Sequence, residues 1–155
     1  MKSFAKFLTG ITLVIVALLA YYLYSSNLPV AAYAKTVNAT ERSEEFYKIR
    51  EGIENGKYEG VSAPYSIDSY FFVTITVSAK NFSPFPAEWA QFVPKGADGD
   101  IIVLLGDAGP KDIGRFKEAE FSVTILTSNP DAYRTGWLEY YILGRFHSVE
   151  AQPKG

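Results

Sequence analysis

Residues 71–79 read Phe-Phe-Val-Thr-Ile-Thr-Val-Ser-Ala, and this stretch decides the fold of the 155-residue chain. From Phe71 onward every second side chain is apolar, while Thr74, Thr76 and Ser78 fall between them. Such alternation, rich in β-branched residues, is typical of a strand with one buried face. The stretch therefore predicts a half-buried strand whose core-facing side chains are Phe71, Val73, Ile75, Val77 and Ala79.

A second stretch, Glu120–Thr127, repeats the alternation and predicts a strand that buries Phe121, Val123 and Ile125. Between the two stretches lies Ile101–Leu105, a continuous apolar run bounded by glycine and aspartate. A short apolar run with such boundaries is typical of a strand covered on both faces, so it predicts a central strand.

The carboxyl-terminal part predicts one long strand, Trp137–Val149, and stretches 58–67 and 88–93 are weaker strand candidates. Proline and glycine turns separate these runs. About five to seven short strands joined in this way predict a mainly β domain, a small antiparallel β-sandwich of immunoglobulin or fibronectin type. The expected core face of the last strand is Leu138, Tyr140, Ile142 and Phe146.

A short amphipathic helix is predicted ahead of these strands, from about residue 38 to residue 54. Asn38 is a suitable cap for its start, and Asn55-Gly56 supplies its end. A single apolar stripe runs along it, formed by Phe46, Ile49 and Ile53. Because this stripe is narrow, the helix is expected either to lie on the domain or to stand between the domain and a membrane.

The run Phe7–Tyr24 contains eighteen residues without a charge. As a helix it rises about 27 Å, close to the ~30 Å hydrocarbon core of a bilayer. Lys2 and Lys6 precede it, so the amino terminus is expected in the cytoplasm and the body outside. The predicted organisation is a cytoplasmic segment 1–6, a transmembrane signal anchor 7–24, a linker with the short helix 25–57, and an extracytoplasmic sandwich 58–155.

Two other fates of the apolar run stay open. Ala32-Tyr33-Ala34 matches a signal-peptidase pattern, which makes residues 1–34 a cleavable signal peptide. The second fate follows from Lys6 and Gly10, with Ile11 opening the apolar helix: this layout resembles the leader of a type IV pilin. The resemblance implies cleavage after Gly10, and it implies that an amphipathic helix and a β-rich head continue the apolar helix. The acidic residue usual at the fifth mature position is replaced by Ile15.

Composition narrows the classes of function. The chain has no cysteine, so a disulfide framework and a thiolate metal site are both excluded. After Lys6 it has 13 basic and 17 acidic residues without a basic cluster, which argues against a nucleic-acid partner. His147 is the single histidine, and no Gly-x-Ser-x-Gly setting accompanies it. Asp98 and Asp100 fit turn chemistry better than a calcium loop. We therefore expect no catalytic residue, no metal and no cofactor.

Aromatic residues are the best candidates for contact with a partner. They fall in two groups, one in the proline-containing segment 81–89 and one near the last strand. Each group is expected either to dock a protein partner or to pack inside the open end of the sandwich. Asn38-Ala39-Thr40 also matches the pattern for N-glycosylation at Asn38, although a chance match, with Asn38 acting as a helix cap, is the favoured interpretation. The interaction candidates are Phe82, Phe85, Trp89, Tyr133, Trp137 and Tyr141.

These observations favour a non-enzymatic module that is anchored in the cell membrane through residues 7–24. Such a module is expected to act at the outer face as an interaction or accessory subunit with a protein partner. The alternatives are a pilin-like subunit processed after Gly10 and a secreted domain that binds a small ligand or carbohydrate.

Overall fold

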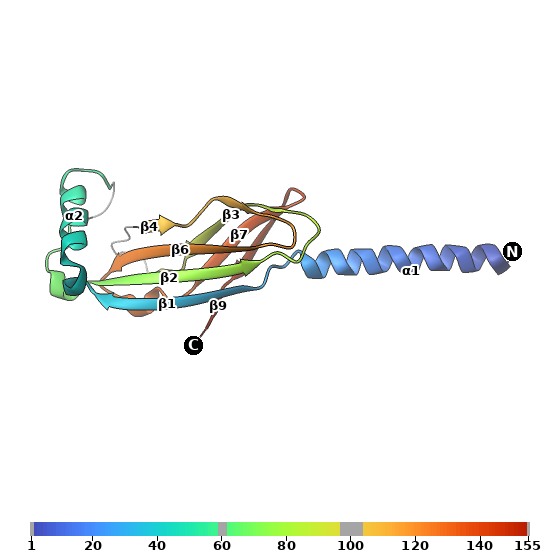
Figure 1. Ribbon diagram of the computed structural model, residues 1–155, viewed down its shortest axis with the longest axis horizontal. Coiled ribbons are helices and arrows are strands. Elements are labelled where there is room, and N and C mark those ends of the chain that lie inside the picture. Colours follow the sequence, from blue (N-terminus) through green and yellow to red (C-terminus); the bar gives the residue numbers. More distant parts are fainter. Residues whose placement is uncertain (1, 59–61, 97–103, 155) are drawn as a thin grey trace.

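The computed structural model describes residues 2–58, 62–96 and 104–154, which form two packed β-sheets and two α-helices (Figure 1). The long helix α1 (Lys2–Ser25) extends from one end of the sandwich along its long axis. The short helix α2 (Ser43–Glu54) lies across the opposite end, and the 3-10 turn η1 (Ala39–Arg42) leads into it. Two more 3-10 turns are η2 (Ile67–Ser69) and η3 (Pro130–Ala132).

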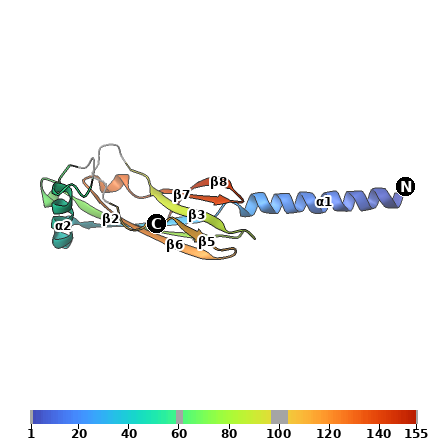
Figure 2. The ribbon, with the colours of Figure 1, turned by 90° about the horizontal axis from the view of Figure 1, so that it is seen from above.

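The two sheets face each other, as the view from above shows (Figure 2). Their strands are antiparallel except for β9, which runs parallel to β1. The five-stranded sheet has the order β4 (Leu104–Asp107), β6 (Glu118–Thr127), β2 (Phe71–Lys80), β1 (Val30–Asn38) and β9 (Gln152–Pro153). The four-stranded sheet has the order β5 (Lys111–Ile113), β3 (Ala87–Pro94), β7 (Gly136–Ile142) and β8 (Arg145–Glu150).

The alternating stretches form the central pair of the larger sheet, and the prediction for them is confirmed. β2 and β6 pair from Phe71 opposite Thr127 to Lys80 opposite Glu118. Their predicted core-facing residues are buried apart from half-buried Phe71, and Thr74 and Thr124 join hydroxyls on the outer face at 2.9 Å. Burial of such apolar faces, at ~25 cal/mol per Å², is the main force that holds the two sheets together.

The predicted long strand at residues 137–149 is wrong, because β7 and β8 form a hairpin. Leu143 and Gly144 make its two-residue turn, with φ angles of 50° and 72°. Backbone of this hand matches the twist of paired strands, so the chain reverses there. Leu138, Tyr140 and Ile142 face the core as predicted, but Phe146 pairs with Tyr141 and is exposed.

Two weaker strand predictions also differ from the structure. Residues 101–103 of the predicted central strand lie outside the described residues, and residues 104–107 form β4 at the edge of its sheet. Tyr58 and residues 62–67, the described part of stretch 58–67, contain no strand. The candidate at 88–93 is confirmed as β3.

Residues 30–38, placed in the linker by the sequence analysis, form strand β1. This strand pairs with β2 along its whole length, from Val30 opposite Ala79 to Asn38 opposite Phe71. Three alanines make its local strand propensity weak, so the free edge of β2 supplies the pairing that the local sequence does not. The sandwich therefore starts at β1, and only residues 26–29 connect it to α1.

Helix α2 lies on the outer face of the larger sheet. Its predicted stripe is confirmed: Phe46, Ile49 and Ile53 are buried and pack in one cluster with Phe72 and Leu126. The Asn38 side chain caps η1 by accepting the Thr40 amide hydrogen at 3.0 Å. Of the two positions left open for this helix, the structure has the one on the domain, at the end far from α1 (Figure 1).

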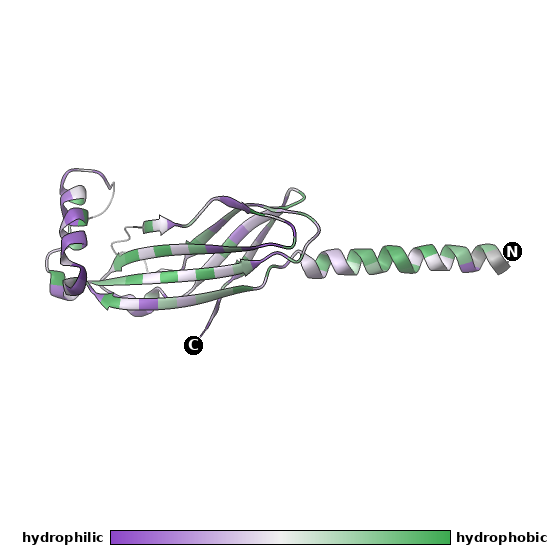
Figure 3. Ribbon diagram, viewed as in Figure 1, coloured by the Kyte–Doolittle hydropathy of each residue, from purple (hydrophilic) through white to green (hydrophobic). Residues whose placement is uncertain are grey.

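The segment Lys6–Ser25 of α1 is long and apolar enough to cross a membrane, and a signal sequence near an amino terminus has the same features. Figure 3 shows this helix as a nearly continuous hydrophobic segment, whereas hydrophobic and hydrophilic residues alternate along the strands.

Candidate functional site

The connection between α1 and the sandwich is short, buried and hydrogen-bonded. Ser26 is buried directly after α1, and Leu28, only 2% exposed, already belongs to the core. The Tyr140 hydroxyl donates a hydrogen bond to the Ser26 carbonyl oxygen at 2.8 Å and accepts one from the Leu28 amide at 3.0 Å. Burial raises the pKa of Tyr140, and the Leu28 amide opposes this effect, so the hydroxyl keeps its proton at neutral pH. Tyr140 therefore ties the helix end to the core of the sandwich.

The loop between β2 and β3 packs against the last turns of α1. The Tyr21 hydroxyl donates a hydrogen bond to the Phe82 carbonyl oxygen at 3.2 Å. The rings of Tyr22 and Phe85 meet edge to face, with their centroids 6.3 Å apart. The aromatic-proline segment singled out in the sequence thus serves partly as a brace between the helix and the sandwich.

Asn81 holds this loop to the neighbouring loop between β5 and β6. Its side chain is fully buried, and each polar atom of it is hydrogen-bonded. Its backbone amide donates a hydrogen bond to the Lys117 carbonyl oxygen at 2.8 Å. The side-chain amide donates to the carbonyl oxygens of Phe85, Ile113 and Gly114, and the side-chain oxygen accepts the Ser83 amide hydrogen. The two loops are therefore positioned as one unit beside α1.

A β-bulge on β3 places Trp89 on the surface. The register with β7 shifts between Glu88 and Gln91, and Trp89 within the bulge has a φ of 54° and is 69% exposed. Asp112 accepts its amide hydrogen at 2.9 Å, and a shallow depression of about 260 Å³ lies between them. A bulky side chain in left-handed backbone is strained, typically by about 1–3 kcal/mol, so surrounding contacts must enforce this conformation.

Tyr141 and Phe146 lie next to the bulge on the outer face of the smaller sheet. Tyr141 pairs with Glu88 on one side and with Phe146 on the other. The rings of Tyr141 and Phe146 meet edge to face at 5.5 Å, and both are exposed. We call Trp89, Tyr141 and Phe146 the aromatic face.

The six sequence-predicted contact residues do not share one surface. Tyr133 is fully buried in the core and is withdrawn as a contact candidate. Phe85 is half-buried against the core and Tyr22, and Trp137 is half-buried with the Lys95 ammonium 5.4 Å above its ring. The other three, Phe82, Trp89 and Tyr141, are exposed.

Sequence reasoning missed three exposed apolar residues near α1. The sequence pattern predicts a core position for Phe146, and it does not distinguish Phe116 or Leu143. Phe116 and Leu143 sit in turns with positive φ, and both are exposed. The available signal was Phe116 itself, a large apolar side chain between Arg115 and Lys117 in a turn.

His147 of β8 stacks on Tyr140, a core-facing aromatic residue of β7. Its ring is parallel to that of Tyr140 at 5.2 Å, and its Nε2 finds no hydrogen-bond partner among the described residues. Burial, with a smaller effect of Arg145, lowers the pKa of His147 below its usual 6.5. The imidazole is therefore neutral at physiological pH and packs as a ring.

Several acidic groups of the described residues pair with neighbouring cations. Lys111 bonds to Asp107 at 2.7 Å and lowers the pKa of that carboxyl. Within residues 2–58, 62–96 and 104–154, no three histidine, aspartate or glutamate side chains gather in a way that fits a metal ion. Asp98 and Asp100 lie outside the described residues.

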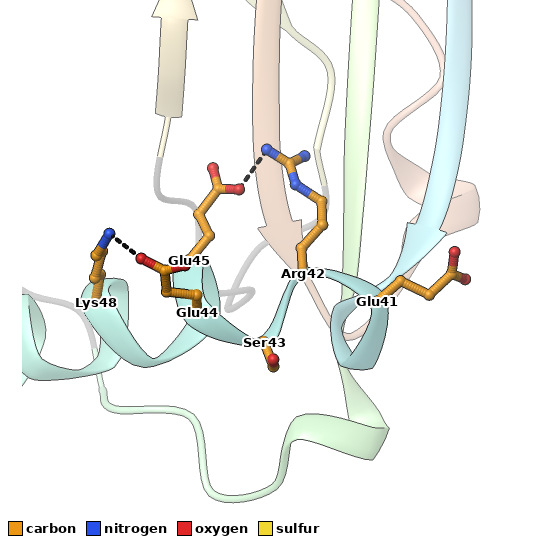
Figure 4. A pocket seen from close by; sticks show the side chains of 6 residues that line it. All are labelled: Glu41, Arg42, Ser43, Glu44, Glu45 and Lys48. Atoms are coloured by element: carbon orange, nitrogen blue, oxygen red, sulfur yellow. Dashed lines mark hydrogen bonds and ion pairs between the residues drawn. The ribbon is translucent and has the colours of Figure 1, made fainter.

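The start of α2 carries charges that pair with one another (Figure 4). Lys48 bonds to Glu44 at 2.6 Å, and Arg42 is ion-paired with Glu45. Lys48 also lowers the pKa of the exposed Glu44 carboxyl. At the nearby Asn38, the side-chain oxygen accepts both the amide and the hydroxyl hydrogen of Thr40, and its glycosylation stays a prediction.

No family model, no curated protein and no solved structure matches this chain. Its function is therefore inferred from the residues and their geometry alone.

Proposed function

We propose that this protein is a single-pass membrane protein whose sandwich stands outside the cytoplasm as a non-enzymatic interaction or accessory subunit. The amino-terminal lysines and the apolar segment Lys6–Ser25 support this orientation. The observation that carries the interaction role is the exposed, strained Trp89, on the same sheet that exposes Tyr141 and Phe146.

The strand order supports the immunoglobulin-like part of the proposal. In constant-type immunoglobulin domains, strands A, B, E and D form one sheet and C, F and G the other. The orders β4-β6-β2-β1 and β3-β7-β8 reproduce D-E-B-A and C-F-G, and β5 is an added edge strand. Such sandwiches commonly present contact surfaces, which fits an interaction module at the level of architecture alone.

Strand β1 supports a retained helix rather than a signal peptide that ends at Ala34. The bond after Ala34 lies in the middle of this strand, which is paired on both sides of it. Cleavage there would remove Leu28, Val30 and Ala32 from the core. The pilin-like alternative receives less support, because a strand and not an amphipathic helix follows α1. Sequencing of the mature amino terminus tests this part: Met1 is expected, and Ile11 or Lys35 would contradict it.

The aromatic face supports contact with a protein partner. Exposed tryptophan and tyrosine are enriched among the residues that dominate protein interfaces. A strained bulge that exposes a tryptophan is unfavourable in the free domain, whereas burial of the ring against a partner would offset that cost. The face joins residues from β3, β7 and β8, so a folded sheet is needed to form it.

This role is tested by capture of the partner protein from detergent extracts, with the wild type, the Trp89→Ala variant and the Tyr33→Ala variant each used as bait. Tyr33 is a matched control, since it is an exposed aromatic residue on β1 of the other sheet. Loss of a central tryptophan typically costs about 2 kcal/mol or more, so we expect recovery of the partner to fall roughly 30-fold with Trp89→Ala alone. Equal recovery with both variants contradicts the aromatic face as the contact surface.

A further inference from the structure

Three loops surround the end of the sandwich from which α1 leaves, and each exposes one large apolar side chain. The strand registers place them together: Val30–Ala79, Lys80–Glu118 and Ile142–Arg145 are terminal pairs at this end (Figures 1 and 2). The apolar side chains are Phe82, Phe116 and Leu143, which are 43%, 58% and 62% exposed. We call these three loops, residues 80–86, 114–118 and 143–145, the rim.

Exposed cations accompany the apolar side chains of the rim. Each cation is one or two residues from an apolar side chain, and the Lys80 ammonium is 5.2 Å from the centre of the Phe82 ring. The rim has a single acidic residue, Glu118, although the whole chain has a net charge of −2. The segment of η1 and α2 at the opposite end is net acidic. The four cations of the rim are Lys80, Arg115, Lys117 and Arg145.

The length of α1 sets the position of the rim relative to a bilayer that the helix spans. The twenty residues Lys6–Ser25 rise about 30 Å, which matches the hydrocarbon thickness of a bilayer, and α1 ends at Ser25, so no further helix lies between this span and the sandwich. The core of the sandwich begins at Leu28, so no flexible tether separates the two. The 80–86 loop touches α1 at Tyr21 and Tyr22, which are inside the candidate span. If α1 spans a bilayer, this loop therefore lies at its outer boundary.

A cleft of about 300 Å³ opens at the same level. Its lining includes Tyr24 at the end of α1, Asn27 just after it, and Phe82 of the rim. Leu28 and Pro29 also line it. The cleft thus offers apolar walls next to the Lys80 cation, a combination that suits the junction of a lipid phosphate with its acyl chains.

We propose that the rim is seated in the bilayer that α1 spans, with Phe82, Phe116 and Leu143 in the interfacial layer and the four cations on lipid phosphates. This inference rests on the proposed membrane anchor. Apolar side chains flanked by lysine and arginine are the usual composition of surfaces that lie in this layer, where the cations are attracted by lipid phosphates. The seat holds the sandwich upright and directs α2 away from the membrane.

Single cysteines in the full-length protein test the seat, because the natural chain has none. Phe116→Cys, Leu143→Cys and Tyr47→Cys are labelled with a polarity-sensitive fluorophore and placed in lipid nanodiscs that contain no other protein. Tyr47 is the control, since it is exposed on α2 at the far end. Replacement of one rim residue at a time leaves the other two in place. We expect blue-shifted emission and quenching by lipids with a headgroup-level quencher at positions 116 and 143, and neither effect at position 47.

A fourth label at Val14→Cys, in the middle of α1, separates this inference from the membrane anchor. One outcome is quenching at position 14 by lipids labelled deep in their chains, with neither blue-shifted emission nor headgroup-level quenching at positions 116 and 143. That result overturns the seat and leaves the anchor intact. Absence of quenching at position 14 overturns both. A third outcome is blue-shifted emission at positions 116 and 143 that is absent with lipid alone and appears only after a partner protein is added. That result assigns the rim to the partner protein and also overturns the seat.

Discussion

Replacement of Tyr140 by phenylalanine isolates the hydrogen bonds that join α1 to the sandwich. The phenylalanine ring fills the same space and keeps the stacking on His147, so packing changes little. The variant removes the partner of the buried Ser26 carbonyl and of the buried Leu28 amide. A buried polar group without a partner costs about 1–3 kcal/mol, so the two together reduce the free energy of unfolding by roughly 2–6 kcal/mol.

Thermal unfolding in detergent micelles measures this loss of stability as a shift in Tm. A domain of about 120 residues unfolds with an entropy of roughly 250 cal/mol/K near 60 °C, so a loss of ~3 kcal/mol lowers Tm by about 12 °C. Hydrogen exchange supplies a local measurement. The Leu28 amide loses its acceptor in the variant, and we expect its exchange to accelerate more than that of Val77 in the middle of β2.

Tyr141→Phe is the matched control on the adjacent position of β7. Its ring is exposed on the aromatic face, so loss of its hydroxyl is expected to change the free energy of unfolding by less than about 0.5 kcal/mol. A Tyr140→Phe variant as stable as Tyr141→Phe, with unchanged exchange at Leu28, would refute the view that this hydroxyl fixes the helix to the domain.

Three further predictions concern other parts of the fold. Asn81→Ala removes the group that ties two rim loops together and should cost about 2–3 kcal/mol in urea unfolding, whereas exposed Asn27→Ala should not. Because folding lowers the pKa of His147, the unfolded state binds its proton more readily; the wild type should therefore lose stability as pH falls from about 7.5 to 5.5, and His147→Gln should flatten this dependence in Tm measurements. Phe46→Ala leaves a cavity beneath α2 and should reduce stability by about 3–5 kcal/mol with loss of helical circular dichroism, in contrast to exposed Tyr47→Ala.

The spacing of apolar residues along the chain explains which parts of this fold the sequence can predict. β2 and β6 follow from alternation, and the stripe of α2 follows from helical spacing, since each pattern records one buried face. β1 has no such pattern, because its alanines are held by pairing with β2, a contact distant in sequence. The turn at Leu143 lacks the Asn-Gly signal of tight hairpins, so Phe146 was given the wrong face.

The candidate site depended even more on contacts that no local pattern encodes. Phe85 and Tyr133 lie in proline-containing segments, where no regular spacing indicates the buried side of the chain. Tyr133 turned inward and Phe85 packed against α1, while Trp89 turned outward through a bulge. Composition supplies residue types that are typical of interaction surfaces, and only the three-dimensional register separates those on the surface from those in the core.

The buried junction also bears on where a partner of the aromatic face is expected. The strands run along the direction of α1, so the sheet faces point sideways from the axis of the helix (Figure 1). A long tether would let Trp89 sample every direction, whereas the Tyr140 bonds and the Tyr22–Phe85 contact hold the sandwich in one orientation. With α1 in a bilayer, the aromatic face then points parallel to the plane of the membrane. We therefore expect the partner captured through Trp89 to be held in the same membrane and to resist extraction with alkaline carbonate, and a partner released by carbonate would contradict this orientation.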